Sequence, residues 1–379
     1  RLCAEWAPSL SAHQLATALH ALSRLRAPPE DPQLLEALHR ELRRRQGSLG
    51  PGGTSAMDTV LLADALARLR VHDEELFAAL AGALRAHLRA GQLRISDVRR
   101  SITAFAMVGF VDLPLSSEAC AWLLPRLADC RGADLVALAG ALSRAGPLGK
   151  ARDEFFAALA REVSQRLRAG EFGARDAAGL VSALSQAGAP FPELSLELMA
   201  VAARAPRELN GEDLALMAPC FGQAAGRRPD LIEGLAVRAA GCAATLSPRQ
   251  LARLICGFSD AGVRGPLLWE ALSRESLVRA AYFSAPDIVR ALAGLHASGA
   301  AQPEVLRAFW ARAAEKSEKL LAEEALVLLK LWSQQPAALR RERAALPESL
   351  LQNLRRRLGH RWQAPPDLAA DLLEWLPAS

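Results

Sequence analysis

The chain has 379 residues, of which 51% are hydrophobic and 23% charged, and its formal net charge is +5. This apolar share is enough for a continuous core and excludes a wholly disordered chain, while no apolar run approaches the roughly 18 residues that a membrane-spanning helix needs. Ala and Leu dominate, Asn occurs only twice and β-branched residues are few, a composition that predicts an all-α protein.

A short motif recurs along the chain at a nearly constant step. It consists of a large apolar residue, a small residue, a variable residue and then usually Ala or Leu, as in Leu184–Ala187 and Phe258–Ala261. We call the large residue the anchor. The steps between anchors are 36 to 44 residues, which indicates a stacked helical repeat. The nine anchors are Leu22, Leu66, Phe105, Leu142, Leu184, Phe221, Phe258, Leu295 and Leu331.

Other positions keep the same register. An apolar residue lies three positions before each anchor, and most units have another seven before it, so all three share one face of a helix. The residue directly before the anchor is Ala, Cys or Gly in eight of nine units, with Lys330 as the exception. Small side chains there predict that neighbouring helices approach closely.

Each unit is expected to contain two helices. Helix A carries the anchor, and helix B follows after a short Gly or Pro break; in the first unit they are predicted at Ser11–Leu25 and Asp31–Arg45. Glycines at the ends of A helices suit a left-handed cap, and these are Gly146, Gly188, Gly226, Gly262 and Gly299. The later B helices are predicted to begin near Asp73, Ser117, Arg152, Pro192, Arg228, Gly265, Pro303 and Pro347.

The longer steps between anchors are explained by insertions in loops, at residues 47–55 and 147–152. The last unit contains an Arg-rich connector at residues 337–345, and a closing helix at 367–376 is predicted to cap the final apolar face. The sequence therefore predicts a right-handed α-solenoid of about nine two-helix repeats of about 37 residues over residues 1–362, followed by a capping helix within 363–379.

No pattern for catalysis or metal binding is complete. Gly146–Lys150 ends in Gly-Lys, but Arg144 and Ala151 stand where a phosphate-binding loop needs Gly and a hydroxyl residue. The seven histidines lack metalloprotease spacing, and the six cysteines form no Cys-x-x-Cys pair. We therefore expect neither enzyme activity nor a cofactor, metal or small-molecule substrate.

Arginine dominates the basic residues, because only four of the 46 are Lys. Arg binds phosphate in a bidentate manner and stacks on bases, so this bias suits RNA. A GC-rich genome, which replaces Lys by Arg and raises Ala and Gly together, is the alternative cause.

Candidate RNA contacts fall into two groups. The first lies two residues after or five before an anchor, on one face of helix A, where a variable position is typical of modular base recognition; a solvated stripe is the alternative. The second consists of basic clusters, which suit phosphates but also stabilise helix C-termini. The first group is Arg24, Arg68, Arg100, Arg144, Gln186, Gln223, Arg253 and Arg290, and the second is Arg43, Arg44, Arg45, Arg340, Arg341, Arg355, Arg356 and Arg357.

With this period and motif, best seen in Leu180–Gly188 and Leu254–Gly262, the chain resembles the heptatricopeptide-repeat proteins over about residues 10–362. It is similar, more distantly, to octotricopeptide repeats and to the helical region of the FAST-kinase-domain family. The resemblance implies an organellar protein that binds, processes or stabilises RNA, and some such proteins are mitoribosome components that hold rRNA fragments. Many carry a C-terminal RAP domain, for which this chain has no room, so a binding role is favoured over a nuclease-like one.

Two functions are therefore expected as alternatives. The first is an RNA-binding subunit of a ribonucleoprotein assembly, most simply a mitochondrial ribosome subunit in the matrix that stabilises rRNA, or an equivalent plastid protein. Its partners would be rRNA or an organellar transcript and other proteins of the assembly, with no membrane. Any targeting peptide would lie upstream of Arg1. The second is a protein–protein interaction scaffold of the armadillo or tetratricopeptide-repeat type, without direct RNA contact.

Overall fold

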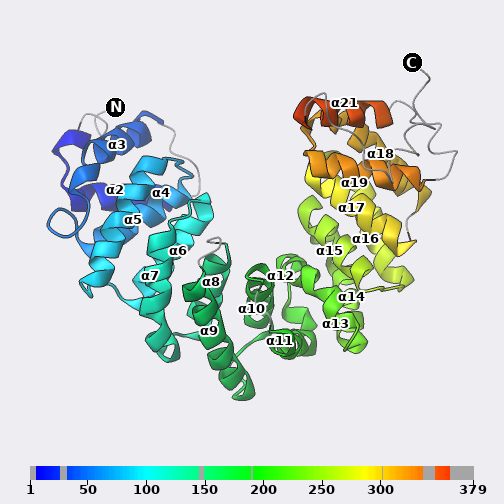
Figure 1. Cartoon of the computed structure of the whole chain (residues 1–379), viewed down its shortest axis with the longest axis horizontal. Helices are drawn as coiled ribbons and strands as arrows, with labels where there is room; N and C mark the ends of the chain where they lie inside the picture. The colour runs from blue at the N-terminus through cyan, green and yellow to red at the C-terminus, as the bar shows by residue number, and fades with distance from the viewer. Residues whose placement is uncertain are drawn as a thin grey trace. The chain divides into compact units, whose positions relative to one another are not determined.

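The computed structural model describes residues 6–25, 32–144, 149–188, 191–300, 302–335 and 346–358, and these contain α-helices and short 3₁₀ turns but no strand (Figure 1). The A helices are α2 (Ala12–Ser23), α4 (Ala56–Arg68), α6 (Ile95–Val108), α8 (Gly132–Ser143), α10 (Ala174–Gln186), α12 with α13 (Gly211–Met217 and Phe221–Ala225), α15 (Pro248–Asp260), α17 (Ala285–Ser298) and α19 (Ala322–Ser333). The B helices are α3 (Pro32–Arg44), α5 (Glu74–Arg89), α7 (Leu113–Leu123), α9 (Lys150–Arg168), α11 (Pro192–Arg204), α14 (Pro229–Cys242), α16 (Pro266–Val278), α18 (Pro303–Glu315) and α21 (Leu346–Leu358).

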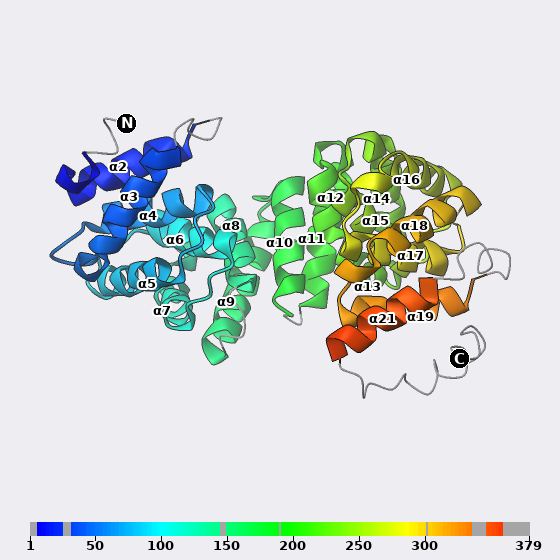
Figure 2. The same cartoon turned by 90° about the horizontal axis from the view of Figure 1, so that it is seen from above.

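The contacts divide the chain into two compact units. Unit 1 comprises Arg1–Phe172 with Ala183–Ser195, and unit 2 comprises Gly173–Ser182 with Leu196–Ser379. Within each unit, A helices pack on the A helices of neighbouring repeats, and B helices pack on B helices. Figures 1 and 2 show this for α4, α6 and α8, which have α5, α7 and α9 alongside. This stacking of two-helix repeats confirms the prediction of an all-α solenoid.

A capping device starts most of the A helices. Each begins ten residues before its anchor, and its third residue is Asp, Glu or Gln. The backbone N–H of Ser11 donates to Gln14 Oε1 at 2.7 Å, and the N–H of Ser247 donates to Gln250 Oε1 at 2.8 Å. Such a bond satisfies an N–H group that the helix leaves free. Sequence reasoning overlooked this column, which consists of Gln14, Asp58, Asp97, Asp134, Asp176, Asp213, Gln250, Asp287 and Glu324.

The ninth anchor is Trp332, so the prediction of Leu331 was wrong by one residue. Trp332 is 1% exposed, whereas Leu331 is only half-buried. Glu324 caps the start of α19 by accepting a hydrogen bond from the backbone N–H of Leu321 at 2.8 Å. The corrected step from Leu295 is 37 residues, as in the three preceding repeats.

Two other boundaries differ from prediction. Helix α7 begins at Leu113 rather than near Ser117, because the Asp112 side chain accepts a hydrogen bond from the Leu115 N–H at 2.6 Å. The sixth A helix is broken into α12 and α13 by a 3₁₀ turn at Ala218–Cys220, because Pro219 has no N–H to donate.

The predicted glycine caps have mixed outcomes. Gly188, Gly262 and Gly299 have the expected left-handed backbone, with φ of 64°, 68° and 65°. Gly226 does not, because its φ is −64°. Gly146 lies outside the described residues, as do the Arg-rich connector at 337–345 and the closing helix predicted at 367–376. The right-handed path of the array stays a prediction.

The small residue before the anchor has the predicted role. A Cβ atom added to Gly257 would lie 2.5 Å from the carbonyl oxygen of Ala218, and one added to Gly294 would lie 2.9 Å from a methyl carbon of Ile255. The backbones of neighbouring A helices therefore approach more closely than a methyl group allows. None of the described helices is long and apolar enough to cross a membrane.

We expect Gly257→Ala to lower the free energy of unfolding by about 1–2 kcal/mol, because helix α15 must move away from Ala218. The matched control is Gly234→Ala on α14, where an added Cβ meets nothing within 4 Å. That substitution is expected to stabilise by about 0.5–1 kcal/mol through helix propensity. Urea unfolding followed by circular dichroism measures both. A Gly257→Ala protein as stable as Gly234→Ala would contradict the packing role.

Candidate nucleic-acid interface

Three guanidinium groups lie on neighbouring A helices of unit 2. Arg253 and Arg290 hold equivalent positions on α15 and α17, five residues before their anchors, and the two helices pack directly together. Arg249 is one turn before Arg253, because Ser247 caps α15 and places Arg249 in its first turn. We call Arg249, Arg253 and Arg290 the arginine cluster; sequence analysis predicted two of them and missed Arg249.

The cluster carries positive charge that the protein balances only in part. Arg290 Nη1 lies 3.2 Å from Asp287 Oδ1, whereas Arg249 and Arg253 form no ion pair with any described residue. Burial lowers the pKa of Arg253, and repulsion from Arg249 and Arg290 lowers this pKa further, while the carboxylates of Glu212 and Asp287 raise it in part. Because an arginine stays protonated in proteins even so, a bound anion would relieve the repulsion.

The side chains at the other predicted positions on the A helices differ in their exposure and in their hydrogen-bond partners. Arg24 and Arg144 in unit 1 and Gln223 in unit 2 are exposed. Gln186 Oε1 accepts a hydrogen bond from Ser143 Oγ at 3.4 Å.

Arg68 and Arg100 both face the buried carboxylate of Asp64 in unit 1. Their Nε atoms lie 3.0 Å and 3.9 Å from its oxygens. The Asp64 carboxylate offsets the charge of one of these two arginines. Arg68 and Arg100 together therefore carry less net positive charge than the arginine cluster does.

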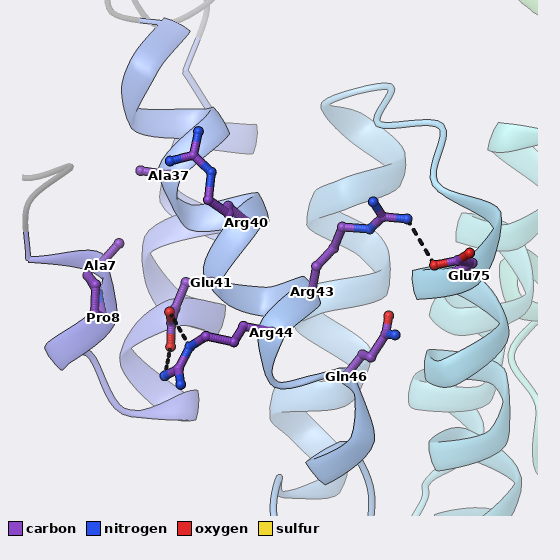
Figure 3. A pocket seen from close by; sticks show the side chains of 9 residues that line it. All are labelled: Ala7, Pro8, Ala37, Arg40, Glu41, Arg43, Arg44, Gln46 and Glu75. Carbon is purple, nitrogen blue, oxygen red and sulfur yellow. Dashed lines mark hydrogen bonds and ion pairs between the residues drawn. The ribbon is translucent and has the colours of Figure 1, made fainter.

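The cluster near the end of α3 does not converge on one point (Figure 3). Arg43 extends toward Glu75, with Nη2 at 3.1 Å from Oε2, and Arg44 forms a bidentate pair with Glu41 at 2.9 and 2.7 Å. The hydrogen bond from Arg44 lowers the pKa of Glu41 most. The adjacent pocket, with a volume of about 500 Å³, is therefore lined by both charges rather than by cations alone.

Arg45 has a structural role that sequence reasoning missed. Its Nη1 donates to the carbonyl oxygen of Leu10 at 2.6 Å, and its Nη2 donates to that of Pro8 at 2.8 Å. Arg45 therefore holds the turn before α2, and its guanidinium has few donors left for a phosphate.

The same arrangement recurs in later repeats. A basic side chain late in helix B donates to carbonyl oxygens of the turn one repeat earlier, which helix ends leave without partners. We call this contact the turn clamp. Its members are Arg45, Arg166 with Cys130 at 2.6 Å, Arg238 with Leu209 at 2.8 Å, Arg279 with Ala244 at 2.5 Å, Lys316 with Phe283, and Arg357 with Glu318 at 3.4 Å.

The C-terminal arginines of α21 are partly engaged. Arg355 is exposed and has no partner among the described residues, Arg356 Nη2 lies 3.6 Å from Glu318 Oε1, and Arg357 Nε donates to Asn353 Oδ1 at 3.0 Å. Arg340 and Arg341 lie outside the described residues.

The described residues contain no group of three His, Cys, Asp or Glu side chains that could hold a metal ion. Burial raises the pKa of Cys120 to about 12 and that of Cys130 to about 11. These two thiols therefore stay protonated and poorly nucleophilic at neutral pH.

Comparison with known proteins identifies no family. No family model matches the chain, and no curated protein matches it in sequence. Among solved structures it is similar to a chain of a homology model of the full-length AP-3 complex in an intermediate open conformation, with 10% identity over 95% of this chain and a TM-score of 0.28. It spans 62% of that chain's length. It is also similar to a circular tandem repeat protein with novel repeat topology, with 16% identity over 99% of this chain and 98% of the other, and a TM-score of 0.21.

Proposed function

We propose that this helical-repeat protein binds RNA and holds its phosphates at the arginine cluster of α15 and α17. The observation that carries the proposal is the pair of cations without an ion-pair partner among the described residues, Arg249 and Arg253, beside Arg290 on the neighbouring A helix. Guanidinium groups on a rigid helical face suit bidentate contact with phosphate. The protein acts in this proposal by binding and has no catalytic step.

The proposal extends to the setting of the RNA. The repeat motif and its 37-residue step, which resemble the heptatricopeptide repeats, support an organellar protein of the mitochondrial matrix or a plastid. An rRNA segment within an organellar ribosome is the RNA we propose. Neighbouring proteins of that assembly would then be its protein partners.

Salt-dependent binding tests the proposal. With a fluorescein-labelled single-stranded RNA of about 20 nucleotides, the double variant Arg253→Gln/Arg290→Gln is expected to bind roughly tenfold more weakly. Because each phosphate contact to a single strand adds about 0.7 to the slope of log K against log salt concentration, that slope should fall by about 1.4.

The matched control is Arg161→Gln/Arg168→Gln on α9, which removes the same charge from exposed positions of a B helix in unit 1. Fluorescence anisotropy over several salt concentrations gives both the affinity and the slope. Equal weakening by the two double variants would mean that charge alone matters, and absence of RNA binding by the unmodified chain would refute the proposal.

A specific surface favours the scaffold as the second candidate function. A pocket of about 660 Å³ lies between α14 and the start of α16 and is lined mainly by apolar residues. Two of these, Val237 and Leu267, are 75% and 76% exposed. Exposed apolar surface of this kind marks protein contacts. If the scaffold function holds, Val237→Asp should abolish co-purification of a protein partner.

A further inference from the structure

The 3₁₀ turns that join helix B to the next helix A form one edge of unit 2. The last three of them are η6 (Ala243–Thr245), η7 (Ala280–Tyr282) and η8 (Ser317–Lys319), and each packs against the B helix of the following repeat, α16, α18 and α21 respectively. Turn clamps join each to that helix, so the three turns follow one another as a ladder. We call them the turn edge.

The middle turn displays the only tyrosine of the chain. Tyr282 is 79% exposed, and Val278, one turn earlier on α16, is 70% exposed. The backbone beneath Tyr282 is held firmly, because its N–H donates to the Arg279 carbonyl at 2.9 Å and the next residue, Phe283, is fully buried. A large ring held in solvent on a rigid turn is suited to stack on a ligand.

Cations without an ion-pair partner among the described residues lie in the repeats before and after this ring. Arg249 lies just after η6 and Lys319 lies in η8; both are exposed and form no ion pair with any described residue. Two carboxylates of this edge are already engaged, because Glu275 Oε2 is 2.5 Å from Arg279 Nη1 and Glu318 Oε1 is 3.6 Å from Arg356 Nη2. Along the repeats, an exposed aromatic ring therefore comes between two cations that have no ion-pair partner among the described residues.

We infer that the turn edge binds a single-stranded segment of RNA, with one base stacked on Tyr282 and phosphates near Arg249 and Lys319. An aromatic platform within a track of cations is the arrangement that binds single strands, because only an unpaired base offers its face to a ring. This inference rests on the proposed function and adds a second contact surface, which Arg249 shares with the arginine cluster.

The experiment compares Tyr282→Ala with Tyr282→Phe in the full chain, using labelled oligouridine of about 20 nucleotides and an RNA duplex of the same length. Tyr282→Ala is expected to weaken binding to oligouridine roughly tenfold through the lost stacking, and Tyr282→Phe to retain it. Lys319→Gln should lower the salt slope by about 0.7. The unmodified chain should prefer the single strand over the duplex. Leu267→Ala, an equally exposed apolar residue outside the turn edge, should change nothing.

The outcomes separate the two proposals. If Tyr282→Ala binds like the unmodified chain while Arg253→Gln/Arg290→Gln loses affinity, the turn edge is refuted and the proposed function stands. Equal binding of duplex and single strand also refutes the turn edge. If Tyr282→Ala keeps RNA affinity but loses a co-purifying protein, the exposed ring belongs to a protein interface instead. If the unmodified chain binds no RNA, both proposals fail.

Discussion

Replacing Trp332 by Ala is expected to lower the free energy of unfolding by about 3–5 kcal/mol, whereas Leu331→Ala should cost less than about 1.5 kcal/mol. Trp332 is 1% exposed, and its ring packs edge-on against that of Trp310, with centroids 5.1 Å apart and an angle of 72° between the planes. Removing the indole leaves a cavity between α18 and α19 that a helix pair cannot close. Leu331 is half-buried, so its truncation removes less apolar contact.

Hydrogen exchange of the backbone amides localises the effect of Trp332→Ala better than global unfolding does, because a repeat array can open locally at its end. The amides of α18 and α19 should lose protection in Trp332→Ala, while those of α4 and α5 keep theirs. Urea unfolding by circular dichroism gives the overall change. A greater loss of stability in Leu331→Ala than in Trp332→Ala would contradict the assignment of Trp332 as the ninth anchor and favour Leu331.

Replacing Arg166 by Gln is expected to cost about 3 kcal/mol, although arginine in a basic chain is easily read as a nucleic-acid contact. The Arg166 side chain is 12% exposed, and it donates to the carbonyl oxygens of Cys130 and Ala128 at 2.6 and 2.7 Å. It also lies 2.6 Å from Glu162. The shorter glutamine leaves these acceptors and the carboxylate without their donor, and an unsatisfied buried group costs about 1–3 kcal/mol.

Arg168→Gln is the matched control, because Arg168 lies two residues further along α9 and is exposed. It removes the same charge and should change stability by less than about 0.5 kcal/mol. Thermal unfolding of the two variants at equal salt concentration measures the difference. If the two variants unfold at the same temperature, the turn clamp at Arg166 makes no net contribution to stability. The arginines late in helix B would then be available to an external ligand.

The turn clamp shows why sequence overestimates the number of contacts available to RNA. A basic residue near the end of a helix fits three roles equally well: a phosphate contact, a charge at the helix dipole, or a donor to a distant carbonyl. Arg45 and Arg357 have the third role, and the partners that decide this are 35 and 39 residues away along the chain. No local pattern contains that information.

The repeat itself was predictable, because the anchors and the small residues before them are local patterns set by the helical period. These patterns determined the fold class, the pairing of helices and most of the boundaries. The tertiary structure decided the register of the last repeat, because Trp332 and Leu331 are both large and apolar and only packing against Trp310 selects between them. It also decided which arginines have no ion-pair partner, because pairing depends on side chains that neighbouring repeats bring together.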